Sequence, residues 1–342
     1  MKPTILTGLR TNADYHLGNY LGAMQPIIRM ANAHSNEHKV HMFIPDLHSF
    51  TSPVDFSTFY EQTFKNLKVF FAAGLPLDNP NVHVYRQGHV SAHSELTVIL
   101  NNFTSFGQLS RMVEFKEKKS RLEDEFVSVG LFDYPVLMVA DILLYDAELV
   151  PVGDDQRQHL ELARDTAERF NNRFGETFVL PKTIKEQAAF FGVEEPLRVM
   201  SLQNPDKKMS KSVTDPAGTI TLFDSPQEAR KKVMSAVTDS LGQINFDRVN
   251  QPGITNLLTM LAVLRGQSQA EVNQEFVGQA QYGGLKQAVA DEVEKVLVDL
   301  QARFNALDDT EVLSKLERDE VYANEYSQAI LAKVQRAIGL RQ

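Results

Sequence analysis

Two short segments, far apart in the sequence, carry side chains that could bind phosphate. Residues 16–19 read HLGN and follow a predicted strand, and residues 207–212 read KKMSKS in a polar stretch. Lys208 and Lys211 are three residues apart, so both ammonium groups can reach one polyanion. His16 can donate a hydrogen bond to phosphate oxygens. Each segment alone is also typical of ordinary structure, as a solvated basic turn or a capped amphipathic helix.

Composition limits the class of protein. The chain has 342 residues, of which 43% are hydrophobic, so it can bury a large core in about two domains. We expect a cytoplasmic protein without a membrane segment, because no run approaches the roughly 18 apolar residues of a span and the N-terminus lacks a signal sequence. Cysteine is absent, so any metal ligand must be oxygen or imidazole. A net charge of -9 argues against DNA and nonspecific nucleic-acid binding, but allows a local basic surface for a structured RNA.

The hydrophobic pattern changes along the chain. Strand-like runs are followed by helical patterns, which predicts an α/β fold with a parallel sheet. Strand signals fade after about residue 216, where helical periodicity dominates. The polar stretch 203–215 between them predicts a linker. The predicted strands are 4–7, 40–44, 82–85 and 149–152, and the predicted helices are 16–30, 91–103, 133–145, 226–240, 254–265, 268–276 and 284–305. Pro135 is expected at the first position of its helix.

Several longer segments carry a resemblance to a known family. They are HLGNYLGA from residue 16, PDLHSFT (45–51), SELTVILNNFTSFGQLSRM (94–112), DYPVLMVADILLY (133–145), PVGDDQ (151–156) with the following RQHLELARDTAERFN, the KMSKS loop and PGITNLL (252–258). Together, in collinear order over most of the chain, they resemble the tryptophanyl-tRNA synthetases of class I. The resemblance implies a Rossmann-like parallel-sheet catalytic domain (1–202), a loop linker (203–215) and a helical anticodon-binding domain (216–342) whose last helix packs back on the catalytic domain.

The resemblance also implies an activity and partners. Enzymes of this family join L-tryptophan to ATP, with Mg²⁺ bound mainly through the phosphates, and transfer the amino acid to tRNA(Trp) as homodimers. One alternative is a tyrosyl-tRNA synthetase, although residues 4–9 lack the tyrosine usual in its first strand. A tRNA-independent nucleotidyltransferase would not need the long helical half. A noncatalytic RNA-binding relative would not need His16 and the loop lysines.

Asp141 interrupts a helix that is otherwise apolar on nearly every side, and a buried carboxylate requires a donor. Met138 and Tyr134 lie three and seven residues earlier, on the same face. An indole N–H is a lone donor on a large apolar ring, so such an acceptor would suit it. In the family this position is the acid that recognises tryptophan. The alternative is a structural aspartate bonded to backbone amides.

The resemblance assigns roles to further positions. The expected catalytic residues are His16, Asn19, Lys208 and Lys211. The expected ATP-binding residues are Arg10, Gly18, Asn19, Gly153, Asp155, Lys208, Met209, Ser210 and Lys211, with Lys116 or Lys118. The expected tryptophan-binding residues are Leu6, Gly8, His48, Tyr134, Met138, Asp141, Val150, Val152 and Gln156. No metal ligand is expected from the protein.

Some positions depart from the family pattern. Residues 10–13 read RTNA where Gln-Pro-Thr/Ser-Gly is usual, so Arg10 could contact the amino-acid carboxylate or a phosphate, or point outward. Leu6 replaces a familiar aromatic, and Asp154 replaces a glutamate. Glutamates interleave with Lys116 and Lys118, so a solvated helix face is an equal reading of that segment.

Overall fold

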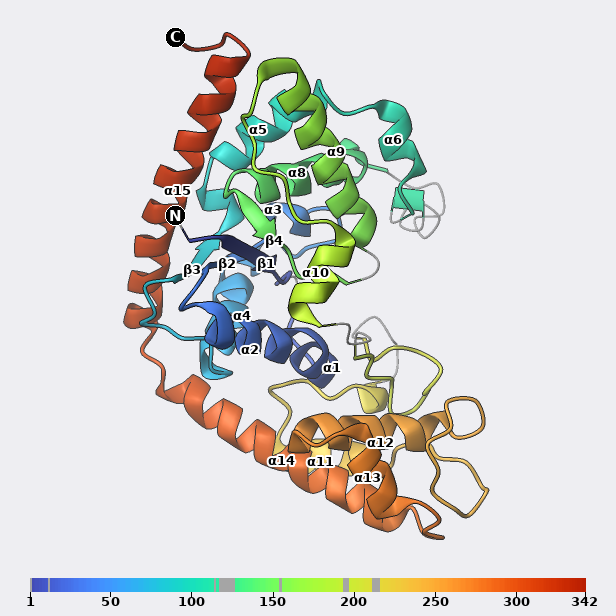
Figure 1. Cartoon of the computed structure of the whole chain (residues 1–342). Helices are drawn as coiled ribbons and strands as arrows, with labels where there is room; N and C mark the ends of the chain where they lie inside the picture. Colours follow the sequence, from blue (N-terminus) through green and yellow to red (C-terminus); the bar gives the residue numbers. More distant parts are fainter. Residues whose placement is uncertain are drawn as a thin grey trace.

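A computed structural model gives the fold of the chain (Figure 1). It describes residues 2–11, 13–113, 115–116, 127–153, 156–192, 197–210 and 216–342. Three predicted site residues, Lys118, Asp155 and Lys211, lie outside the described residues, as does Asp154.

A four-stranded parallel sheet lies at the centre of the N-terminal part. Its strands are β1 (Thr4–Gly8), β2 (Lys39–Ile44), β3 (Val82–Arg86) and β4 (Ala147–Leu149), in the order β3-β2-β1-β4. Every paired neighbour is parallel. The predicted parallel α/β fold is therefore confirmed, and it is Rossmann-like.

Alternation along the strands divides the core between the two faces of the sheet. Ile5 belongs to the apolar cluster on one face and Leu6 to the cluster on the other. The first cluster includes the helix that follows β1, which continues as α1 (Leu17–Asn19), η1 (Tyr20–Met24, a π-helix) and α2 (Gln25–His34), and also α4 (Phe59–Ala72). The second includes α5 (Ala92–Asn101), α8 (Val129–Leu143) and α9 (Arg157–Phe174).

The fourth strand is shorter and earlier than predicted. The expected run 149–152 overlaps β4 only at Leu149. Pro151 has no N–H for a sheet hydrogen bond, and the N–H of Val150 donates to the side-chain Oε1 of Gln187 at 3.0 Å. Val150 and Val152 therefore belong to the segment after the strand, although both pack on the second cluster.

The predicted position of Pro135 is wrong. Helix α8 begins at Val129 because the Ser128 hydroxyl accepts from the N–H of Leu131 at 3.1 Å, which caps the helix four residues before the predicted start. Pro135 therefore lies inside the helix and not at its first position. The helix ends at Leu143, two residues before the predicted end.

Short helices connect the larger elements. They are α3 (Asp46–Ser49), η2 (Gln87–His89), α6 (Phe106–Arg111), α10 (Ile184–Phe191) and η4 (Pro216–Gly218). Both α3 and η2 follow the carboxyl ends of strands, which is where open α/β sheets bind their ligands.

The chain after residue 225 is helical. It contains α11 (Pro226–Met234), α12 (Pro252–Arg265), α13 (Gln269–Phe276), α14 (Gly283–Ala306) and α15 (Asp309–Ala337), with α14 packed on α11 and α12. Helix α11 ends six residues before the predicted Ser240. The N–H of Val237 donates to the carbonyl of Leu202 at 2.8 Å, which takes the chain back toward the first domain. A Cβ on Gly253 would lie 2.2 Å from the Val237 carbonyl oxygen, so only glycine fits there.

Helix α15 covers the open edge of the sheet at β3 (Figure 1). Asp319 accepts from the N–H of Val84 at 2.7 Å, and Lys315 Nζ donates to the carbonyl of Val82 at 2.6 Å. Glu320 holds the guanidinium of Arg86 through two hydrogen bonds of 2.6 and 3.0 Å. These side chains supply the partners that an edge strand otherwise lacks. Within the described ranges, no helix is long and apolar enough to cross a membrane.

This edge contact predicts a measurable stability effect. Arg86 and Glu320 expose only 9% and 10% of their side chains, so Arg86→Leu leaves a buried carboxylate poorly compensated. We expect a loss of about 3 kcal/mol or more in the free energy of unfolding, measured by urea denaturation. The double variant R86L/E320L should recover much of it, because both charges are then gone. The exposed pair Arg303 and Asp299 is the control, and D299A should change stability by less than about 0.5 kcal/mol. A small effect of R86L would show that the pair does not hold α15.

Candidate active site

The two phosphate-binding segments predicted from the sequence lie together. The backbone of His16 pairs with that of Thr221 in an antiparallel bridge, and the N–H of Leu17 donates to the carbonyl of Ile220 at 2.8 Å. A Cβ placed on Gly18 would lie 3.5 Å from the Cβ of Met209. The start of the first helix and the lysine loop therefore form one site, although they are distant in the sequence.

His16 caps the helix that follows it. Its Nδ1 accepts from the backbone N–H of Asn19 at 3.2 Å, and its own N–H donates to Asn19 Oδ1 at 3.2 Å. In a neutral ring with an accepting Nδ1, the proton is on Nε2, which is then the donor. A side chain at Gly18 would come within 3.0 Å of this ring, so glycine keeps the imidazole in place. The cap thus fixes the tautomer that a phosphate ligand requires.

The lysine loop is anchored by one apolar side chain. Met209 is 1% exposed, and its N–H donates to the carbonyl of Val199 at 2.9 Å. Ser210 is held through its carbonyl, which accepts from the Thr219 hydroxyl at 3.1 Å. Lys208, beside the buried methionine, is exposed. The described part of the loop therefore holds Lys208 in solvent next to a rigid anchor.

Asp141 is buried on α8, with 1% of its surface exposed, and accepts hydrogen bonds from three side chains. His48 Nε2 donates to Oδ2 at 2.8 Å. Gln87 Nε2 and His93 Nδ1 donate to Oδ1 at 2.7 and 2.6 Å. The three donors come from α3, η2 and α5, which all follow the carboxyl ends of β2 and β3. The carboxylate is thus held by side chains and not by the backbone amides of the alternative interpretation.

The surroundings keep Asp141 ionised. Burial raises the pKa of a carboxyl group, but the hydrogen bonds from His48 and His93 outweigh it and lower the pKa of Asp141 to about 2. A carboxylate has about four acceptor positions, and the described donors fill three of them. One acceptor position therefore remains on Oδ2.

Several other predicted tryptophan-binding residues belong to the apolar cluster that also contains residues of α8. Leu6 and Val150 are buried, and Met138 and Val152 are partly buried, in the cluster on the α8 face of the sheet. Gly8 ends β1, where an added Cβ would meet the Phe43 carbonyl at 2.7 Å.

Tyr134 lies beside this group. Its hydroxyl is 3.0 Å from His159 Nε2, and its ring centroid is 6.1 Å from that of His48. Gln156 comes at the start of α9, where its N–H donates to the carbonyl of Gly153 at 2.9 Å.

Two predicted ATP-binding residues lie exposed at the surface. Arg10 exposes its side chain, while its carbonyl accepts from the Tyr15 hydroxyl at 3.1 Å. Lys116 is exposed after α6. The ATP-binding roles of Arg10 and Lys116 therefore stay predictions.

Sequence reasoning did not identify Gln87 and His93. Both come shortly after β3, at the edge of the sheet where ligands bind, and this position was the available signal. It was weak, because polar residues are also common in ordinary turns after strands.

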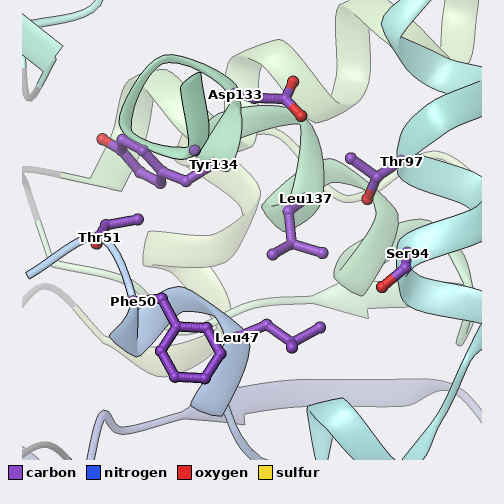
Figure 2. Close-up of a pocket in the computed structure, with 9 residues that line it drawn as sticks. Leu47, Phe50, Thr51, Ser94, Thr97, Asp133, Tyr134 and Leu137 are labelled. Carbon is purple, nitrogen blue, oxygen red and sulfur yellow. The ribbon is translucent and has the colours of Figure 1, made fainter. Parts of the chain in front are cut away.

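A surface hollow of about 280 Å³ lies between α3, α5 and α8, and the predicted tryptophan-binding residue Tyr134 is one of the residues that line it (Figure 2). Leu47 and Leu137 point toward each other across it, and Thr97 and Asp133 lie at its rim. Phe50, which is 49% exposed, is one of the residues that line it. The apolar lining therefore extends onto the open surface.

Comparisons with known proteins agree with this geometry. A family model described as tRNA synthetases class I (W and Y) matches residues 1–298. The tryptophan–tRNA ligase of Caldanaerobacter subterraneus subsp. tengcongensis is 43% identical, over 98% of this chain and 98% of its own. That of Enterococcus faecalis is 39% identical, over 98% of each.

Solved structures give the same result. The tryptophanyl-tRNA synthetase from Mycoplasma pneumoniae superposes with a TM-score of 0.83 at 32% identity, covering 100% of this chain and 99% of its own. That from Campylobacter jejuni, in complex with ADP and tryptophan, superposes with a TM-score of 0.78 at 30% identity, covering 98% and 99%. The chain therefore belongs to the class I tRNA synthetases, in the family of the tryptophanyl enzymes.

Proposed function

We propose that this protein is a tryptophan–tRNA ligase, which activates L-tryptophan with ATP and transfers it to the terminal adenosine of tRNA(Trp). One observation carries the proposal. A site built for phosphate, where His16 and Gly18 meet the lysine loop, occurs in one domain with a buried acceptor, Asp141, that suits an indole N–H. The tryptophan-specific relatives support the same substrate.

In the activation step, a tryptophan carboxylate oxygen attacks the α-phosphorus of ATP. A new O–P bond forms as the bond between the α-phosphorus and the bridging oxygen breaks, and pyrophosphate leaves with the electron pair. Such a reaction needs positioning and charge neutralisation more than a covalent nucleophile. His16 Nε2–H would donate to the α-phosphate, and the ammonium groups of Lys208 and Lys211 would hold the departing pyrophosphate.

The donor set at this site indicates how Mg²⁺ would bind. His16, Lys208 and the backbone N–H groups of α1 are hydrogen-bond donors and cations, which suit phosphate oxygens and not a metal ion. Mg²⁺ usually keeps several water ligands and binds substrate phosphates. It would therefore arrive with ATP and neutralise phosphate charge, and the residues present fit that arrangement.

The proposed tryptophan site uses the remaining acceptor position on Asp141 Oδ2. The indole N–H would donate there, and Met138, Val150 and Val152 would cover the apolar ring. Gln156, at the start of α9, would receive the amino group. Residues 4–9 lack the tyrosine that tyrosyl-tRNA synthetases usually place in their first strand, so tryptophan is preferred over tyrosine.

We assign tRNA recognition to the helical part, α11 to α14. It is connected to the site by the segment after the lysine loop, which pairs with His16 and Leu17 before entering α11. Binding of the anticodon by these helices could therefore act on the phosphate site through a short path.

We also propose that two copies associate through the face that carries the hollow in Figure 2. Large apolar side chains are exposed there and on the neighbouring segments, where contacts with solvent are unfavourable. They are Phe50 (49%), Phe56 (77%), Val98 (65%), Phe106 (75%) and Val129 (81%). A second copy of the chain would bury this apolar surface.

The proposed role of Lys208 can be tested directly. Lys208→Ala should lower kcat for tryptophan-dependent pyrophosphate exchange about a hundredfold, because the ammonium meets charge that develops as pyrophosphate leaves. The KM for tryptophan should change much less. Lys207→Ala, at the neighbouring exposed lysine, is the matched control and should stay within about twofold. Equal losses in kcat and in tryptophan binding for K208A would contradict the role in the transition state.

A second prediction separates the two half-reactions. An anticodon variant of tRNA(Trp) should lose charging, whereas pyrophosphate exchange with free tryptophan stays unchanged, since the helical part is not needed for activation. Charging should also fall with salt more steeply than activation, because tRNA binding neutralises phosphates. Identical responses of both reactions would rule out this division of tasks.

The third prediction tests the dimer. Phe106→Asp places a charge on the proposed interface and should shift the protein to a monomer, measured by analytical ultracentrifugation. Val321→Asp, on the exposed face of α15 at 59% exposure, is the control and should leave the mass unchanged. A wild-type monomer at micromolar concentration would exclude the dimer.

A further inference from the structure

Two side chains beyond the predicted site hold one oxygen of the substrate-recognising carboxylate. Asp141 Oδ1 accepts from His93 Nδ1 at 2.6 Å and from Gln87 Nε2 at 2.7 Å. Both side chains are fully buried, at 0% exposure. Neither side chain is among the apolar residues proposed to cover the indole. They would therefore affect substrate recognition only through their hydrogen bonds to Asp141.

The proton on His93 is placed by its two partners. An ionised carboxylate only accepts, so the contact with Asp141 requires a hydrogen on Nδ1 of His93. Tyr145 Oη lies 2.9 Å from Nε2 and can donate to it. Burial raises the pKa of Tyr145, so its hydroxyl keeps its proton. Tyr145, His93 and Asp141 therefore form one continuous chain of buried hydrogen-bonding side chains.

The amide of Gln87 is also held in one orientation. Its Nε2 faces Asp141, and among the residues that the structure describes its Oε1 has no hydrogen-bond partner. An unpaired buried oxygen is costly. If the amide were reversed, Gln87 Oε1 would face Asp141 Oδ1, and two oxygens would repel each other. The carboxylate therefore keeps the Nε2 donor of Gln87 directed at it. A methionine would fill this space without that cost, which indicates that the donor itself is needed.

Other groups near the carboxylate are accounted for. His48 from α3 donates to Oδ2 at 2.8 Å, on the oxygen that keeps the remaining acceptor position. The charge of Asp141 also acts on the hydroxyls of Tyr85 and Tyr145, and both have raised pKa values, chiefly because they are buried. The two donors on Oδ1 thus fix the rotation of the carboxylate and leave Oδ2 to the substrate.

We propose that His93 and Gln87 are positioning residues that make Asp141 discriminate in favour of an aromatic ring with an N–H donor. This inference rests on the proposed role of Asp141 in tryptophan binding. Without the donors on Oδ1, the carboxylate could rotate, and burial would favour its neutral form. A neutral or rotated group accepts an indole N–H less well and also rejects a ring without N–H less strongly. The residues would act on specificity without contacting the substrate.

The experiment compares L-tryptophan with its benzothiophene analogue, in which sulfur replaces the N–H. The ratio of kcat/KM for the two is measured by amino-acid-dependent pyrophosphate exchange. His93→Leu removes the donor, whereas His93→Asn keeps an amide N–H near the position of Nδ1. We expect His93→Leu to lower the ratio at least about tenfold, mainly through a higher KM for tryptophan, and His93→Asn to stay within about threefold of wild type.

Gln87→Met is a second variant that acts on the same oxygen. It removes the donor together with the unpaired Oε1, so the thermal midpoint should not fall, whereas the ratio should again drop at least about tenfold. A purely structural glutamine would give the opposite result, a changed midpoint and an unchanged ratio. If His93→Leu does not fold, Gln87→Met decides.

The outcomes distinguish a failure of the positioning role from a failure of the proposed function. If folded His93→Leu and Gln87→Met proteins keep the wild-type ratio while wild type is active with tryptophan, the positioning role is overturned and the proposed function stands. If wild type shows no tryptophan-dependent exchange, the proposed function fails, and the positioning role fails with it.

Discussion

The organisation of this domain depends on a carboxylate placed where water does not reach. An ionised group inside a helix as apolar as α8 is unfavourable unless several donors converge on it. Those donors come from separate elements, His48 on α3, Gln87 on η2 and His93 on α5, so the packing of all three onto α8 determines the geometry of Asp141. The packing of the fold therefore also determines the specificity that we propose for the site.

That arrangement depends in turn on the edge of the sheet. Gln87 directly follows β3, and the unpaired side of β3 is satisfied by Asp319, Lys315 and Glu320 of α15. The C-terminal helix thus holds in place the strand that immediately precedes Gln87. His41 and His83 stand two residues before Phe43 and Tyr85 on their strands, and they extend a layer of histidine and tyrosine rings from Tyr145 to Tyr322 of α15. Residues near the end of the chain hence support a site built by its first half.

Much of this could be predicted from the sequence. The parallel sheet followed from alternating strand and helix patterns. The meeting of residues 16–19 with the lysine loop followed from motif resemblance, and the structure places Gly18 against Met209 of that loop. Local signals failed where a tertiary partner decided the outcome. The fourth strand ends early because Val150 bonds to Gln187, and α8 starts early because Ser128 caps it, so that Pro135 was placed wrongly.

The partners of Asp141 could not be predicted because no local pattern links a helix residue to side chains after two different strands. The buried acceptor and the exposed lysine differ in their surroundings, and this difference suits the separate roles that we propose for them. In the proposed mechanism, recognition of the amino acid relies on buried groups that are already held in place, so little reorganisation is needed when the substrate arrives. In the same proposal, charge neutralisation relies on Lys208, an exposed lysine beside the buried Met209, whose ammonium keeps its hydration until a phosphate replaces the water. A rigid acceptor on α8 and a solvated cation on the lysine loop would thus suit a reaction that first selects a neutral ring and then meets a departing polyanion.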